Sequence, residues 1–101
     1  SNQFVVPIVG DDRIKSLIVM SLSLEVTAGT TELAFAREPK IRDEFLRVLF
    51  DYANLGGFDG TFTDVGRLNG LREQLLIAAK RVIGDSLQTV LITEIARQDS
   101  R

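Results

Sequence analysis

Cysteine and histidine are both absent from this sequence of 101 residues. Their absence removes thiol nucleophiles, disulfides, imidazole general bases and every common zinc ligand except carboxylate. Carboxylates act as general acids or bases only when their pKa values are strongly perturbed, and no serine stands in a G-x-S-x-G motif. We therefore predict a domain that is not an enzyme, with no catalytic residue, no cofactor and no metal site.

Basic charge is also scarce. The chain has 12 Lys and Arg against 14 Asp and Glu, which gives a formal net charge of −2. Domains that bind nucleic acid usually carry a basic stripe that neutralises phosphates, so we predict no nucleic-acid partner. Hydrophobic residues make up 45% and charged residues 26%, as is typical of a soluble globular protein, and the length suits one domain over residues 1–101.

Long apolar runs are missing as well. No uninterrupted run reaches the ~20 residues that a membrane span needs, and no signal peptide is visible. The chain begins with Ser1-Asn2 rather than Met, which is typical of residues left by a cleaved tag. We therefore expect residues 1–2 to be a tag remnant and the chain to be a fragment of a longer protein.

Two apolar stretches near the start predict β-strands. Residues 4–9 are apolar and β-branched, and Pro7 favours an edge position because it cannot donate to a ladder. Residues 14–26 alternate with a period of two, which predicts a strand with one buried face. The residues on that face are Ile18, Met20, Leu22, Leu24 and Val26. A helix that seals this face is the simplest completion.

Helical periodicity then predicts two helical segments. Residues 31–52 carry an apolar stripe, and Pro39 predicts either a kink or two consecutive helices there. Residues 64–83 carry a second stripe that Gly84 ends, and residues 87–96 predict the last strand. The predicted class is α+β: a small, mainly antiparallel sheet with two helical segments on one face, in the order β-β-α-α-β.

Clusters of acids and glycines offer little specific chemistry. The adjacent acids Asp11-Asp12 and Asp43-Glu44 are typical of a turn and of a charged helix face. Residues 59–70 fail as a calcium-binding loop, because Asp64 stands where the EF-hand needs glycine. We predict a capped, glycine-rich turn into the second helix instead. The glycines of residues 56–60 match neither dinucleotide nor nucleotide phosphate motifs.

Four segments follow one another in a recognisable order, and they are VMSLSLEV (19–26), PKIRDEFLRVL (39–49), TDVGRLNGLREQLL (63–76) and LITEIARQ (91–98). Together these segments resemble the FliL family of flagellar basal-body proteins. The first ends in the leucine-glutamate-aliphatic triplet of that family, and the last carries its Thr93-Glu94 pair and terminal Gln98. Their order and spacing resemble the family across about 95 residues, although Ile92 replaces a frequent aromatic residue. The resemblance is that of a divergent member.

The resemblance implies a stomatin-like (SPFH-like) fold and a single-pass protein of the bacterial inner membrane. This domain would then lie in the periplasm, with a membrane helix upstream of the sequence. Implied partners are other copies of the chain, in a ring, and the flagellar stator and basal body. The implied function is structural or regulatory, in support of torque and swimming.

Two other functions stay open. One is a periplasmic small-molecule or lipid-binding domain of the same topology, and the less favoured one is an enzyme that uses carboxylates alone. We expect the isolated domain to be monomeric or weakly associating, since its charged helix faces suit adjustable contacts. Candidate contact surfaces are the edge strand 4–9 and the loop with Phe58 and Phe62, although both rings would equally suit the core.

Overall fold

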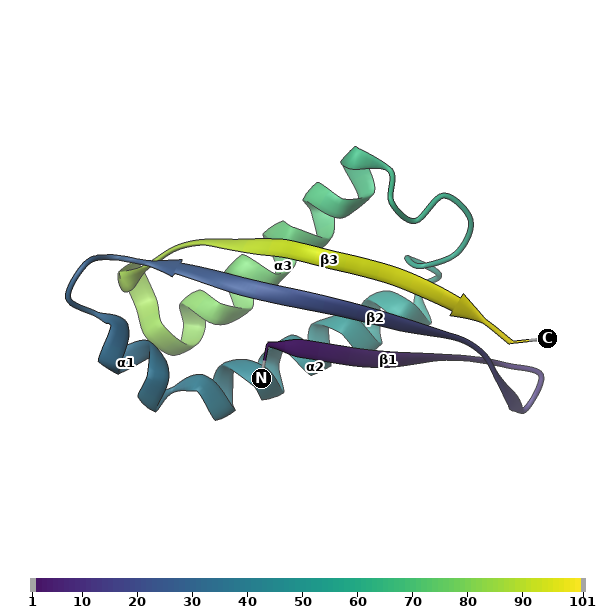
Figure 1. Ribbon diagram of the computed structural model, residues 1–101, viewed down its shortest axis with the longest axis horizontal. Helices are drawn as coiled ribbons and strands as arrows, with labels where there is room; N and C mark the ends of the chain where they lie inside the picture. The colour runs from purple at the N-terminus through teal and green to yellow at the C-terminus, as the bar shows by residue number, and fades with distance from the viewer. Residues whose placement is uncertain (1, 101) are drawn as a thin grey trace.

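A long middle strand organises the fold. The computed structural model describes residues 2–100 as a three-stranded antiparallel sheet, in the order β1-β2-β3, with helices on one face (Figure 1). The elements are β1 (Gln3–Gly10), β2 (Arg13–Val26), α1 (Thr31–Ala36), α2 (Glu38–Asn54), α3 (Val65–Ile83), a 3-10 turn (Gly84–Ser86) and β3 (Leu87–Asp99). The 14 residues of β2 extend for about 45 Å at ~3.3 Å per residue, close to the 47 Å length of the molecule.

β1 and β2 form a hairpin. The two residues of its turn, Asp11 and Asp12, have φ values of 52° and 62°, as a two-residue turn between twisted strands requires. Asp11 and Asp12 therefore serve as turn residues, as predicted. The register pairs Pro7 with Leu17, and β1 lies at the edge of the sheet, which confirms the edge position that Pro7 predicted.

β3 pairs with the other side of β2. It extends to Asp99, three residues beyond the predicted end at Ala96, and its register pairs Ser16 with Asp99. The Ser16 hydroxyl donates to the Asp99 carboxylate over 2.7 Å, which supports this last pair. The register shifts twice along β3, where Thr93 and Gln88 are extra residues opposite β2.

The helical region differs in detail from the prediction. Residues 31–54 form two consecutive helices, which is one of the two outcomes that Pro39 predicted, and the element order is therefore β-β-α-α-α-β where β-β-α-α-β was expected. Arg37 separates α1 from α2, and Pro39 lies in the first turn of α2. Inside a helix, proline has no N–H to donate to the preceding turn, and its ring clashes with the carbonyl four residues earlier. In the first turn of a new helix that N–H would have no partner, and no preceding turn is present to clash with the ring.

The core lies between the sheet and the helices. α2 packs along β1 and α3 along β3, and their apolar stripes meet the predicted inner face of β2. The buried side chains of β2 are Ile18, Met20 and Leu22. They meet Ile41, Phe45, Leu49, Leu71, Leu75 and Val90. The opposite face of the sheet has no helix among residues 2–100, and Val5 there is 49% exposed.

The inner face of β2 can be tested at Leu22. We expect Leu22→Asp to lower the free energy of unfolding by at least ~3 kcal/mol, because the carboxylate would be buried without a partner. Leu22 is only 3% exposed. The matched control is Ser23→Asp, on the other face, for which we expect a change within about 1 kcal/mol. Denaturant unfolding measures both, and equal stability of the two variants would contradict this assignment of faces.

Candidate functional site

Among residues 2–100, β1 pairs with only part of the length of β2. The pairing of β1 with β2 ends at Gln3 and Ser21, followed by a hydrogen bond of 3.0 Å from the Leu22 N–H to the Asn2 carbonyl. β3 continues along the other side of β2 as far as Val26. Residues 23–26 of β2 therefore have a strand on one side and none on the other among the described residues.

The backbone groups at this edge point away from β3. Successive residues of a strand direct their N–H and C=O groups to opposite sides. The backbone N–H of Leu22 points toward β1, where it donates to Asn2. The carbonyl of the preceding residue, Ser21, points toward β3, where it accepts from the Thr93 hydroxyl over 3.2 Å. The same alternation directs the N–H and C=O of Leu24, and the N–H of Val26, to the unpaired edge.

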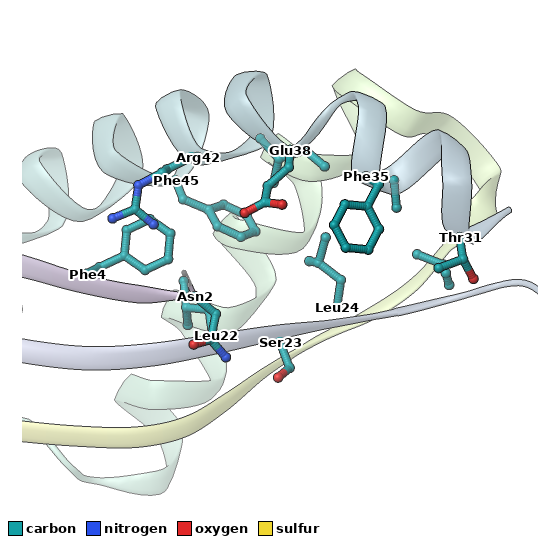
Figure 2. A pocket seen from close by; sticks show the side chains of 13 residues that line it. Asn2, Phe4, Leu22, Ser23, Leu24, Thr31, Phe35, Glu38, Arg42 and Phe45 are labelled. Atoms are coloured by element: carbon teal, nitrogen blue, oxygen red, sulfur yellow. The ribbon is translucent and has the colours of Figure 1, made fainter.

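A groove lies between this edge and the helices. Its volume is about 330 Å³, and it opens beside the start of β1 (Figure 2). The apolar residues that line it come from four elements, and they are Phe4, Leu22, Leu24, Val26, Ala34, Phe35, Ile41 and Phe45. Figure 2 shows Leu24 of β2 and Phe35 of α1 facing each other, with Glu38 and Arg42 of α2 along the upper wall. We define this feature as the β2–α1 groove.

α1 forms one wall of the β2–α1 groove without joining the core. None of its residues is buried, and Phe35 is 72% exposed. The helix is positioned by the turn before it, where the Thr30 hydroxyl donates to the Thr27 carbonyl over 2.6 Å and Gly29 adopts a φ of 87°. A phenyl ring that is exposed beside an apolar groove is typical of a contact surface rather than of a packing residue.

Arg42 closes the end of the β2–α1 groove nearest to β1. Its Nη2 donates to the Gln3 carbonyl over 2.7 Å, and its guanidinium lies 4.3 Å from the centre of the Phe4 ring. The Arg42 side chain thus connects α2 to β1. The Gln3 carbonyl lies on the outer edge of β1, and Pro7 has no N–H to offer there. The edge strand 4–9 is therefore less suited to pair with a neighbour than the sequence indicates.

The two phenylalanines of the glycine-rich loop point inward. Phe58 is 1% exposed and its ring centre lies 4.9 Å from that of Tyr52, while Phe62 packs partly buried against the core. Arg97 of β3 holds this loop, since its Nη1 donates to the carbonyls of Phe58 and Gly60 over 3.1 and 3.0 Å. The prediction of Phe58 and Phe62 as a contact surface is wrong, and their alternative placement in the core is correct.

The acidic motifs are part of the scaffold. Asp64 is the N-cap of α3 and accepts from the Arg67 N–H over 3.3 Å, so the predicted capped turn is confirmed. The Arg67 guanidinium also donates to the carbonyls of Asp59 and Gly56, which fixes the loop before α3. Asp43 is exposed on α2, as predicted. No group of three or more acids in residues 2–100 is arranged to hold a metal ion.

The β2–α1 groove was not predicted from the sequence. The apolar residues of α1 were read as part of a helix whose stripe faces the sheet, whereas Phe35 lies beside the sheet edge. One signal could have indicated the groove: the first apolar stretch, 4–9, is much shorter than the second, 14–26. Antiparallel partners of unequal length leave part of the longer strand unpaired.

Comparisons with known proteins add no relative. No protein-family model matches the chain, and a search of curated proteins finds no significant match. No helix in residues 2–100 is both long and apolar enough to cross a membrane.

The inward position of Phe58 can be tested by truncation. We expect Phe58→Ala to cost about 3–5 kcal/mol of stability, because the substitution removes a fully buried ring and leaves a cavity beside Tyr52. Leu55→Ala in the same loop is the control, since Leu55 is 87% exposed, and we expect a change below about 0.5 kcal/mol. Similar melting temperatures for both variants would show that Phe58 does not contribute to the core.

Proposed function

We propose that this chain is a non-catalytic structural or regulatory domain of the bacterial flagellar basal body. In this proposal it associates with the stator, supports torque generation and swimming, and acts through protein–protein contacts. It is anchored by a helix upstream of the sequence in the inner membrane, with this domain in the periplasm. The anchored protein associates with other copies of itself in a ring.

The resemblance to the FliL family supports the flagellar part of this proposal. The four segments that resemble the family include residues of β2, α2, α3 and β3, so they involve both layers of the fold. A stomatin-like arrangement is part of the same proposal. It is compatible with an α+β domain that has a three-stranded antiparallel sheet and helices on one face.

One observation carries the proposal of a contact function: the β2–α1 groove combines apolar side chains with unpaired backbone groups at residues 23–26. A site of this kind offers a polypeptide both main-chain hydrogen bonds and a place for its side chains. The exposed Phe35 adds an aromatic group of the type that is enriched at interfaces.

A small-molecule or lipid-binding domain is the second candidate, and the same groove favours it. Its volume of about 330 Å³ lies at the lower end of the range for small-ligand sites, and its lining is mainly apolar. A lipid chain would use the apolar walls but would leave the backbone groups of Leu24 and Val26 without partners. The protein-contact function accounts for both features.

Deletion of the gene tests the flagellar role. We expect the deletion strain to swim more slowly in soft agar, with fewer fluorescent stator units at the motor, and we expect the full-length gene to restore both. The reason is that the domain is proposed to act at the stator. A deletion strain with normal swimming and normal stator localisation would refute the flagellar role, whatever the groove binds.

The expected weak self-association has its own test. We expect the isolated domain to scatter light as a monomer at micromolar concentration, because its described helix faces carry mixed charges and a ring would depend on the membrane to concentrate neighbours. Multi-angle light scattering over a dilution series measures the mass. A dimer that persists on dilution to nanomolar concentration would contradict the expectation.

A further inference from the structure

We propose that another cavity, between the β1–β2 hairpin and the end of α2, binds a small zwitterion with a short aliphatic group. The chemistry is that of a free aliphatic α-amino acid such as leucine. In this proposal Lys15 contacts the carboxylate of the ligand and Asp59 contacts its ammonium group. The site is separate from the β2–α1 groove, and the proposal does not depend on the flagellar role.

This cavity, which we define as the hairpin–α2 cavity, lies at the end of the sheet farthest from α1 (Figure 1). Its volume is about 310 Å³. Neither Asn2 nor Ser100 is part of its lining. Ser100 lies at the other edge of β2, where its N–H donates to the Lys15 carbonyl over 2.7 Å. The hairpin–α2 cavity is therefore formed by internal segments of the chain.

An irregularity in the hairpin brings Lys15 to the cavity. The register of the hairpin shifts between Ile8 and Val9, which leaves Lys15 as an extra residue opposite β1. Such an extra residue bends the strand and re-aims a side chain. The Lys15 side chain lies against Gly10, where a Cβ would overlap the Lys15 Cδ. Glycine at position 10 thus leaves room for the path by which Lys15 reaches the cavity wall.

Asp59 reaches the same cavity from the loop before α3. Its carbonyl accepts from the Arg67 guanidinium over 2.8 Å, and its Oδ2 lies close to Gly56, 3.2 Å from where a Cβ would stand. Among residues 2–100, the structure shows no salt bridge or hydrogen bond for the side chain of Lys15 or of Asp59. Two opposite charges thus line one cavity without meeting, which leaves space for a ligand that carries both charges.

The rest of the lining favours a ligand with an aliphatic part. Ile8, Phe50 and Ala53 supply apolar surface, and the Asn54 amide supplies a donor and an acceptor. Phe50 is 41% exposed, so an aliphatic group placed against it would remove apolar surface from water. A simple anion would be repelled by the carboxylate of the site, and a simple cation by its ammonium group. A volume at the lower end of the range for small-ligand sites suits a molecule of this size.

An NMR titration of the domain with L-leucine tests the proposal. We expect saturable shifts of the backbone amides of Lys15, Asn54 and Gly56, with a dissociation constant of about 1 mM or below. 4-Methylpentanoate lacks the ammonium group and 3-methylbutylamine lacks the carboxylate. Each should bind about three- to fivefold more weakly than leucine, because each loses one exposed charge contact. No saturable shift below about 10 mM, or equal affinity for leucine and both analogues, would overturn the proposal.

Two variants separate the roles of the two charges. Lys15→Met should weaken the binding of leucine and of 4-methylpentanoate about threefold or more, without changing that of 3-methylbutylamine. Asp59→Asn should weaken leucine and 3-methylbutylamine but not 4-methylpentanoate. Lys40→Met and Asp43→Asn are the matched controls, since both residues are exposed on α2 outside the lining, and should change none of the three affinities. Equal effects of Lys15→Met on the two analogues would contradict the roles assigned here.

Gly10→Ala tests the position of Lys15 with every charge kept. The new Cβ would displace the flexible Lys15 side chain, so we expect leucine to bind about threefold more weakly while the circular dichroism spectrum stays unchanged. Unchanged affinity would contradict the position assigned to Lys15.

The result is separable from the proposed function. Leucine binding together with normal swimming of the deletion strain would support this site and reject the flagellar role. Absence of leucine binding together with a swimming defect would reject this site and leave the proposed function standing.

Discussion

The full length of β2 is the constraint on which the rest of the structure depends. β2 needs its full length to hold the core residues and to pair with β3 as far as Val26. Among residues 2–100, β1 covers only part of that length, so the described helical layer meets a three-stranded sheet at one end and a two-stranded sheet at the other. α1 lies over the two-stranded end, which explains why it has no buried residue.

The two ends of the molecule also differ in how firmly their loops are held. At the three-stranded end, Arg97 and Arg67 donate to carbonyls of the loop before α3, and the buried Phe58 anchors that loop. At the two-stranded end, α1 is connected through a short turn and packs mainly against α2. A helix with few buried contacts opens locally at low free-energy cost. The groove thus combines a firm β-sheet floor with an adaptable helical wall.

Sequence patterns predicted the parts of this fold that follow from local periodicity. The alternation in residues 14–26 identified the inner face of β2, and Pro39 indicated the break between α1 and α2. The groove was beyond these patterns because it arises from the lengths of two strands relative to a helix that follows them. The role of Arg42 was missed for a similar reason: its acceptor, the Gln3 carbonyl, is a backbone group far away in the sequence.

The outer edges of β1 and β3 carry features that hinder pairing with another chain. Edge strands are commonly protected against unwanted pairing by proline, by bulges or by side chains that cover the backbone. β1 has Pro7 and the cover of Arg42 over the Gln3 carbonyl, and β3 has its two extra residues. Leu24 lies instead beside an apolar groove of about 330 Å³. Among residues 2–100, unwanted pairing is thus hindered along the outer edges of both β1 and β3.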